Sequence, residues 1–561
     1  MIVWSRSKIL SALLACAYIV IMMIPNVWLA FTEPWSEWAT AASIVLPLGF
    51  YLGWSVMMRR SGVTIWLSFP FIFFGAFQVV LLYLFGNSIV AADMFTNLLT
   101  TNPGEAGELL ANIWPAVLYV FAVYLPLLSV AIREMRYKRA VPIRLRRLFG
   151  GVGLSLFTVG LLLLIPASRR HEGSVLKDCI FPINVFYNLK LSVSEYYKVT
   201  HFEESSQGFS YEAHRIQESP DREIYLFVIG EASRACNWQL YGYERETTPH
   251  LAATEDLLCF GNVITQSNTT HKSVPMILSS VATHQHDEIY LRKGIPALFR
   301  EAGFTTSFIS NQAPQGAMVD KLAADSHHLH YVGSPHLDMQ MLERMKQEIE
   351  QSNPNEDLFF ILHCYGSHFS YYQRYPRDFA RFQPDEDVAI TPKNIEKIRN
   401  AYDNSILYTD HFLHEVIEYL RSLEGCCTAM LYCSDHGEDL LDDERDRFLH
   451  ASPTTTYYQT HVASVAWFSE RYREAFPEKV EAALANQMAP ATTHSLFHTM
   501  ADMASIESPY FEREVSLLNS GFNYQRPRYY LDDHNHARPF TQVGINERDL
   551  ETFRHFGIEI E

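Results

Sequence analysis

The sequence predicts a membrane domain of five α-helical spans followed by an exported α/β domain with a mostly parallel sheet covered by helices. Three observations lead to this fold class. Long apolar stretches are confined to the first 166 residues. Beyond residue 220, short apolar runs alternate with helix-like segments. Residues 1–170 hold 13 basic and 6 acidic residues, whereas the remainder holds 32 basic and 57 acidic residues.

Five apolar stretches near the amino terminus have the length of membrane spans. Each is close to the ~20 residues that a helix needs to cross a ~30 Å hydrocarbon core. The first stretch lies where a signal peptide would lie. Because four more stretches follow it and no small-residue cleavage site stands out, we expect it to be a retained span. The stretches are 9–31, 38–57, 63–86, 115–132 and 149–166.

Basic residues predict the orientation of these spans. Arg6 and Lys8 precede the first span, Arg59 and Arg60 follow the second, and seven basic residues lie between 133 and 147. The alternating loops, 31–37 and 86–114, contain no lysine or arginine. Because cytoplasmic loops carry the excess of Lys and Arg, we expect a cytoplasmic amino terminus and an exported segment after about residue 167.

The chain therefore divides into three parts: membrane domain 1–166, amphipathic connector and linker 167–220, and catalytic domain 221–561. Near-continuous apolar strands that alternate with helices are typical of a parallel sheet buried on both faces. The acidic balance of the exported part argues against nucleic acid as a partner, which requires basic surface. Expected strands are 224–230, 257–264, 305–310, 358–366, 428–435 and 464–469, and expected helices include 294–303 and 395–423.

Three of the expected strands end in residues that can bind a metal. Glu231 directly follows the first, Asp435 and His436 end the fifth, and His368 follows the fourth. A hydroxyl-rich turn, TQSNTTHKSVPM (265–276), precedes a helix-like segment. Because ligand groups gather at the carboxyl ends of parallel strands, these residues should meet. Zinc accepts such nitrogen and oxygen ligands and can activate a serine or threonine hydroxyl.

Structural readings compete with this one. A single glutamate at a strand end is more often a helix cap, and only the set together favours a metal site. We expect His327, His328 and His330 to lie in a solvated loop, and His494 and His498 to serve packing or to support other residues. Among eight cysteines we expect few disulfides.

Several segments resemble the phosphoethanolamine transferases of Gram-negative envelopes. These are membrane enzymes of the alkaline phosphatase superfamily, and they include the transferases that confer polymyxin resistance by modifying lipid A. The resemblance covers almost the whole chain, including the membrane half. The segments are GEASRACNWQLYGYERETTPHL (230–251), NTTHKSVPM (268–276), YGSHFSYYQRYP (365–376), AYDNSILYTD (401–410) and SDHGE (434–438) with LH (449–450).

The resemblance assigns roles to the strand-end residues. Glu231, Asp435 and His436 match zinc ligands. Thr270 matches the nucleophile, whose oxygen is the fourth ligand, and Thr269 is the neighbouring candidate.

Further residues match the substrate-binding set of this family. His368 and His450 match histidines that line the donor phosphate or a second zinc. Asn97, Thr101 and Glu105 match polar residues that hold the ethanolamine head group. Their spacing would place all three on one helical face. A solvated helix in the loop is the alternative for these three.

The sequence also departs from the family pattern. Gln266 and Met276 occupy the places of a disulfide that flanks the nucleophile in lipid A-modifying members. Gln312 and Gln315 stand where a serine and a lysine are expected. The SNQ version of this segment (310–312) resembles the subgroup that acts on lipopolysaccharide core sugars, which leaves the acceptor open between lipid A and the core.

The resemblance implies a zinc-dependent transferase in the bacterial inner membrane with its catalytic domain in the periplasm. Phosphatidylethanolamine would be the donor and an envelope glycolipid the acceptor, and we expect a monomer. One alternative is a related membrane-anchored metal-dependent phosphodiesterase or a glycerophosphate-type transferase. Another is a membrane scaffold that has lost catalysis.

Overall fold

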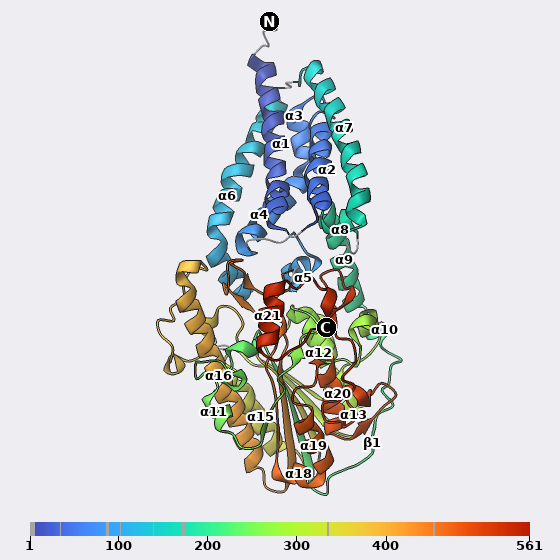
Figure 1. Ribbon diagram of the computed structural model, residues 1–561, viewed down its shortest axis with the longest axis vertical. Helices are drawn as coiled ribbons and strands as arrows, with labels where there is room; N and C mark the ends of the chain where they lie inside the picture. The colour runs from blue at the N-terminus through green and yellow to red at the C-terminus, as the bar shows by residue number, and fades with distance from the viewer. Residues whose placement is uncertain are drawn as a thin grey trace. The chain divides into compact units, whose positions relative to one another are not determined.

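The computed structural model describes residues 6–33, 35–85, 89–100, 103–137, 140–170, 174–333, 336–452 and 455–560 (Figure 1). Contacts divide the chain into two compact units. One comprises residues 1–96 and 103–194, and the other comprises residues 97–102 and 195–561. The predicted boundaries at 166 and 220 stay predictions.

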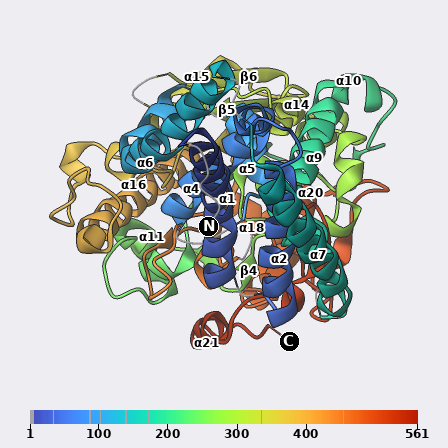
Figure 2. The ribbon, with the colours of Figure 1, turned by 90° about the horizontal axis from the view of Figure 1, so that it is seen from above.

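The first unit is helical. Glycines let two of its long helices, α2 and α7, pack closely side by side (Figures 1 and 2). A Cβ atom at Gly49 of α2 would lie 2.3 Å from the backbone nitrogen of Phe157 in α7. Small residues at such interfaces are typical of membrane helices. Its helices are α1 (Arg6–Thr32), α2 (Glu37–Ser55), α3 (Ser61–Leu67), α4 (Phe69–Phe85), α5 (Ala92–Thr100), α6 (Pro103–Arg136), α7 (Ile143–Ser168) and α8 (Val175–Asp178), and α9 (Ile183–Thr200) extends into the second unit.

The predicted count of five spans is not confirmed. Among the described residues, three helices are long and apolar enough to cross a membrane: Ile9–Thr32, Ile113–Arg136 and Ile143–Ser168. The pair α3 and α4 gives a fourth candidate, bent by 62° at the break between the helices. Pro70, near the start of α4, has no N–H to continue the hydrogen-bond ladder of α3. Helix α2 has only 19 residues with a glutamate in its first turn.

The second unit is built on a seven-stranded sheet with the order β3-β11-β8-β2-β7-β5-β6. The central strand β2 pairs in parallel with both β7 and β8, and β11 pairs antiparallel with β8 and β3. The mostly parallel sheet is therefore confirmed, with one reversed strand. Its strands are β2 (Arg222–Gly230), β3 (Leu257–Cys259), β5 (Thr305–Ser310), β6 (His328–Tyr331), β7 (Leu358–His363), β8 (Cys426–Ser434) and β11 (Ser464–Phe468).

Helices cover both faces of this sheet, as predicted (Figure 1). Alternate residues of β2 belong to two separate hydrophobic clusters: Phe227 lies in one and Leu226 in the other. The first cluster includes α12 (Thr270–Ile277), α13 (Ile295–Glu301) and α20 (His494–Met503). The second includes α15 (Met339–Gln351) and α16 (Ile395–Ser422). Burial on both faces explains why β2 is apolar along almost its whole length.

Two predictions of secondary structure, one of a strand and one of a loop, need correction. The stretch 257–264 forms two strands, because β4 (Val263–Ile264) leaves the main sheet and pairs with β12 (Ala491–Thr492). His328 and His330 lie in the edge strand β6 and not in a loop. This strand is short and largely exposed, so it lacks the apolar run that marks the central strands.

The remaining elements are short, except for α19 and α21. They are α10 (Phe202–Ser205), β1 (His214–Arg215), α11 (Pro249–Ala253), α14 (Met318–Ala323), β9 (Asp439–Leu440), β10 (Phe448–Leu449), α17 (Tyr457–Thr460), α18 (Glu470–Ala475), α19 (Pro477–Ala485), β13 (Ile506–Glu507), β14 (Tyr529–Leu531), β15 (Ala537–Pro539) and α21 (Glu547–His555).

Candidate metal centre and nucleophile

The ends of two neighbouring strands bring three predicted ligands together. Gly230 at the end of β2 is in register with Ser434 at the end of β8. The next residues along the two strands are Glu231 and Asp435, and His436 follows. All three side chains are completely buried. The prediction that these residues meet at the carboxyl edge of the sheet is therefore confirmed as geometry.

Thr270 is the first residue of α12, and its hydroxyl points into this cluster. Thr270 Oγ1 lies 3.3 Å from both carboxylate oxygens of Glu231 and 3.0 Å from His436 Nε2. His436 Nε2 lies 3.4 Å from Glu231 Oε1 and 3.3 Å from Asp435 Oδ2. Thr269, the N-cap residue, places its hydroxyl 3.4 Å from that of Ser267. Of the two threonines, Thr270 is the one with contacts to the cluster.

These four residues fit a zinc ion. In a tetrahedral site with metal–ligand distances of ~2.0–2.1 Å, neighbouring ligand atoms are about 3.3 Å apart, close to the separations found here. His436 Nδ1 lies 2.9 Å from the carbonyl oxygen of Gly437. A carbonyl can only accept, so Nδ1 carries the proton and Nε2 keeps its lone pair for a metal.

Burial shifts the pKa values of the three candidate ligands. Burial raises the pKa of Asp435 to about 7 and raises the pKa of Glu231 well above its usual value. The nearby charge of Asp435 raises the pKa of Glu231 further. Burial also lowers the pKa of His436 well below its ordinary range. A divalent cation between these atoms would supply the charge that favours ionised carboxylates and a neutral imidazole.

A second set of groups holds the ligands in place. Ser273, one turn along α12 from Thr270, donates a hydrogen bond of 3.0 Å to Asp435 Oδ2. The backbone N–H groups of Ala232 and His436 donate to Asp435 Oδ1. Gln312 Nε2 donates to Glu231 Oε2 at 2.9 Å. Gln312 therefore orients the candidate ligand Glu231 directly. In the sequence, Gln312 stands out only as a departure from the family pattern, and that departure does not predict this contact.

Gly366, in the turn that follows the neighbouring strand β7, lies against Glu231. Its φ is +44°, and a Cβ atom at this position would lie 2.9 Å from the carbonyl oxygen of Glu231. We expect Gly366→Ala to displace Glu231 and to lower the zinc content of the purified protein, measured by elemental mass spectrometry. Gly242→Ala is the control, because Gly242 also has a positive φ but has open space around it. Full zinc content in Gly366→Ala would contradict this role.

The two further histidines lie close to the cluster. The His450 ring is centred 4.1 Å from that of His436, and its Nδ1 is 3.7 Å from Glu438 Oε2. His368 Nδ1 is 2.5 Å from the carbonyl oxygen of Phe369, so Nδ1 carries the proton and Nε2 can accept one. Burial lowers the pKa of His368 to about 3.

Glu438 is a site residue that the sequence reasoning did not single out. It is fully buried, and its Oε1 accepts a hydrogen bond of 2.8 Å from Tyr371. Its charge contributes to the raised pKa of Glu231. The available signal was its place in SDHGE, three residues after Asp435.

The predicted head-group residues are not tested. Asn97 belongs to α5 and Glu105 to α6. Thr101, and the side chains of Asn97 and Glu105, lie outside the described residues. Their common helical face and their role stay predictions.

Gln266 and Met276 stand at the two positions that the family pattern links by a disulfide, and neither is a cysteine here. The Gln266 side chain bonds to the hydroxyls of Thr283 and Thr493, at 2.9 and 3.2 Å. Met276 is fully buried. All eight cysteines are described and free, in agreement with the expectation of few disulfides.

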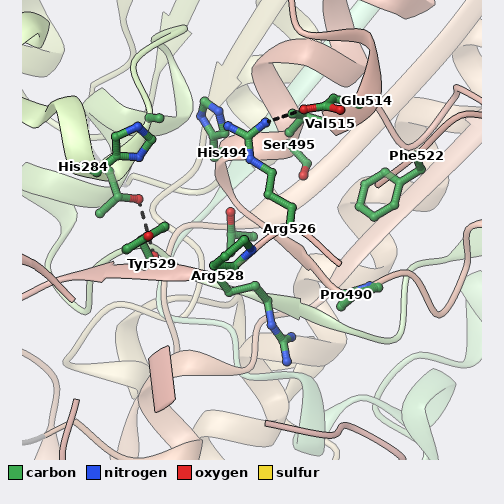
Figure 3. A pocket seen from close by; sticks show the side chains of 14 residues that line it. His284, Pro490, His494, Ser495, Glu514, Val515, Phe522, Arg526, Arg528 and Tyr529 are labelled. Atoms are coloured by element: carbon green, nitrogen blue, oxygen red, sulfur yellow. Dashed lines mark hydrogen bonds and ion pairs between the residues drawn. The ribbon is translucent and has the colours of Figure 1, made fainter. Parts of the chain in front are cut away.

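A second cluster, around His494, lies beside another pocket of the second unit (Figure 3). Ligand atoms of His494, His498 and Glu512 all lie within 4.8 Å of one another. However, the Glu512 N–H donates to His498 Nδ1, which leaves the proton on Nε2, and Arg526 pairs with Glu512. This arrangement does not suit a metal, so the structural role predicted for the two histidines is retained.

The chain is similar to known phosphoethanolamine transferases. The Kdo(2)-lipid A phosphoethanolamine 7''-transferase of Escherichia coli K12 is 29% identical over 279 residues, 48% of either chain. Phosphoethanolamine transferase EptA of Salmonella typhimurium is 25% identical over 484 residues, 81% of this chain and 84% of that one. The chain thus spans about half of the first relative and most of the second.

Solved structures show the same fold. The integral membrane lipooligosaccharide phosphoethanolamine transferase A (EptA) of Neisseria meningitidis matches with a TM-score of 0.71 at 22% identity, over 90% of this chain and 98% of that one. The periplasmic domain of Escherichia coli EptC in complex with zinc matches with a TM-score of 0.52 at 22% identity, over 59% and 95%.

The family model described as Sulfatase matches residues 223–506, about half of the chain and most of the unit that contains the cluster. The predicted resemblance is confirmed: the chain belongs to the sulfatase family of the alkaline phosphatase superfamily, and its relatives are phosphoethanolamine transferases.

Proposed function

We propose that this protein transfers phosphoethanolamine from phosphatidylethanolamine to an envelope glycolipid, lipid A or the lipopolysaccharide core, through a covalent intermediate on Thr270. The observation that carries the proposal is the position of Thr270 Oγ1, 3.0 Å from His436 Nε2 and 3.3 Å from the Glu231 carboxylate. The names of the relatives support the reaction class, and the EptC complex supports zinc.

Glu231, Asp435, His436 and Thr270 would hold the zinc. When bound there, zinc supplies positive charge that stabilises a phosphoryl group and an ionised threonine oxygen. In the first half-reaction, Thr270 Oγ1 forms a bond to phosphorus and the bond from phosphorus to the diacylglycerol oxygen breaks. The proton lost by Thr270 balances the proton gained by the released diacylglycerol.

The surroundings of Thr270 suit a phosphoryl group. His368 has a pKa lowered to about 3 and keeps a lone pair on Nε2, so it would accept a hydrogen bond from the substrate and would not carry a proton. Thr270 opens α12, and the partial positive charge of a helix amino terminus favours the phosphate that Thr270 would carry. In the second half-reaction, an acceptor oxygen forms a bond to phosphorus and the bond from phosphorus to Thr270 Oγ1 breaks. The proton lost by the acceptor balances the proton that Thr270 regains.

The membrane arrangement is part of the proposal. We place five spans at α1, α2, the α3–α4 pair, α6 and α7, with the amino terminus in the cytoplasm and the catalytic domain in the periplasm of a bacterial inner-membrane protein. The distribution of basic residues supports this orientation. We propose that the protein acts as a monomer.

The test is a measurement of product stoichiometry with purified protein in phosphatidylethanolamine vesicles. Without acceptor, a transferase should release about one diacylglycerol per protein and then stop, because the intermediate has nowhere to go. Added lipid A or core oligosaccharide should restart turnover. Continuous release of free phosphoethanolamine would identify a phosphodiesterase, and no release with zinc absent would identify an inactive scaffold.

Glu105 offers a test of donor recognition. If Glu105 binds the ammonium of the donor, Glu105→Gln should raise the apparent KM for phosphatidylethanolamine about tenfold, a change that corresponds to ~1.4 kcal/mol. Glu108→Gln, a neighbouring acid in α6, is the matched control. Zinc content should not change in either variant. An unchanged KM in Glu105→Gln would assign the head group to other residues.

A further inference from the structure

A narrow pocket opens beside the nucleophile. Its lining includes Thr270 and Gln312 together with residues of β5, α14, β6 and β7. It has room for about one or two water-sized groups. Apart from Thr270 and Gln312, its polar and aromatic lining residues are His271, Phe308, Ser310, Gln315, Asp320, Tyr331 and His363.

His363 lines this pocket and has a nitrogen without a hydrogen-bond partner among the described residues. The residue ends β7 and is only 3% exposed, and its Nε2 has no hydrogen-bond partner among the described residues. Ser310 Oγ donates to the carbonyl oxygen of Gln312 at 3.0 Å, and His363 Nδ1 lies 3.1 Å from Ser310 Oγ. Nδ1 therefore donates to Ser310, and Nε2 is left as a buried acceptor without a donor.

Asp320 gives the pocket a negative charge. Its Oδ2 accepts hydrogen bonds from the backbone N–H groups of Gln315 and Ala317, and its Oδ1 accepts one from the Tyr331 hydroxyl. No lysine or arginine of the described chain forms an ion pair with Asp320. Gln315, at the place of the lysine expected from the family pattern, also leaves the pocket without a cation.

We infer that this pocket binds the ammonium of the phosphoethanolamine group while that group is attached to Thr270, with His363 Nε2 and Asp320 as its acceptors. This inference rests on the proposed transfer reaction. An ammonium is about the size of a water molecule and carries three N–H donors. Its positive charge would balance the negative charge of Asp320. The aromatic rings of Phe308 and Tyr331 are compatible with a cation.

The subsite would act at a different stage from Glu105. Glu105 would recognise the intact lipid and would therefore affect KM. Asp320 and His363 would hold the group that is being transferred and would affect kcat, because their contacts persist after diacylglycerol leaves.

The test compares two ligands that differ only in the amine: O-phosphoethanolamine and ethyl phosphate, titrated calorimetrically into the zinc-loaded full-length protein. The wild-type protein should bind O-phosphoethanolamine about tenfold more tightly than ethyl phosphate. Asp320→Asn and His363→Leu should lose this preference while their affinity for ethyl phosphate stays unchanged. His363→Gln, which keeps an acceptor, should retain part of it.

Gln315→Lys provides an independent variant. It adds a positive charge to the pocket and keeps the hydrogen bond from the Tyr331 hydroxyl to Asp320. It should weaken binding of O-phosphoethanolamine and spare ethyl phosphate, whereas the neutral control Gln315→Leu should not discriminate. Equal affinity of the wild-type protein for the two ligands, or no binding of either, would overturn the subsite. If the Thr270 adduct still forms in that case, the proposed transfer reaction stands; if the adduct is missing, that reaction fails.

Discussion

Replacing Thr270 by alanine is expected to abolish transfer of phosphoethanolamine to envelope glycolipids. The substitution removes the oxygen that would form the bond to phosphorus, so the rate should fall at least about a thousandfold. The fold should persist, because this hydroxyl forms its hydrogen bonds with Glu231 and His436 of the cluster. Mass spectrometry of glycolipids from cells with the wild-type or the variant gene measures the effect.

Two neighbouring variants separate chemistry from structure. Thr270→Ser keeps a hydroxyl and should retain measurable transfer. Thr269→Ala should also remain active, because the Thr269 side chain does not cap α12 and does not contact the cluster. Retained glycolipid modification in Thr270→Ala, or its loss only in Thr269→Ala, would contradict the assignment of the nucleophile.

Asp435→Asn is expected to release zinc from the protein. The amide keeps nearly the same shape and can still accept from the N–H groups of Ala232 and His436, but it lacks the charge that a divalent cation requires. Loss of a residue that only supports a metal ligand typically lowers metal affinity by about 10- to 100-fold. Loss of a ligand itself should therefore lower the affinity for zinc by more than this. Titration against a zinc indicator gives the dissociation constant.

Glu514→Gln is the matched control for this loss of charge. Glu514 is an acid outside the metal cluster, paired with Arg526 at the pocket of Figure 3. Its zinc content should equal that of the wild-type protein. Unchanged zinc affinity in Asp435→Asn would show that Asp435 is not a ligand.

The geometry of the candidate site was predictable from the sequence because it depends on strand ends. Apolar runs long enough to be buried strands end at Glu231 and at Asp435, and parallel strands bring their carboxyl ends to one edge. Thr270 could be chosen over Thr269 only through the family resemblance. Spacing alone does not determine which of two adjacent hydroxyls faces the cluster.

Other features depend on contacts that a linear pattern does not contain. His363 ends an apolar strand, and nothing in LFFILHCYG indicates that it lines a pocket beside Thr270. Strand β11 is as apolar as its neighbours, so its antiparallel direction depends on how the chain enters the sheet. Gln312 looked like a lost family residue, but the fold uses its amide to orient Glu231.

The central claim is a covalent phosphoethanolamine group on Thr270. The direct measurement is peptide mapping by tandem mass spectrometry, after incubation of the zinc-loaded protein with phosphatidylethanolamine vesicles and an acid quench without acceptor. We predict a phosphoethanolamine adduct on Thr270 that disappears when lipid A or core oligosaccharide is added. An adduct on Thr269 or on any other residue, or diacylglycerol release without an adduct, would contradict the account.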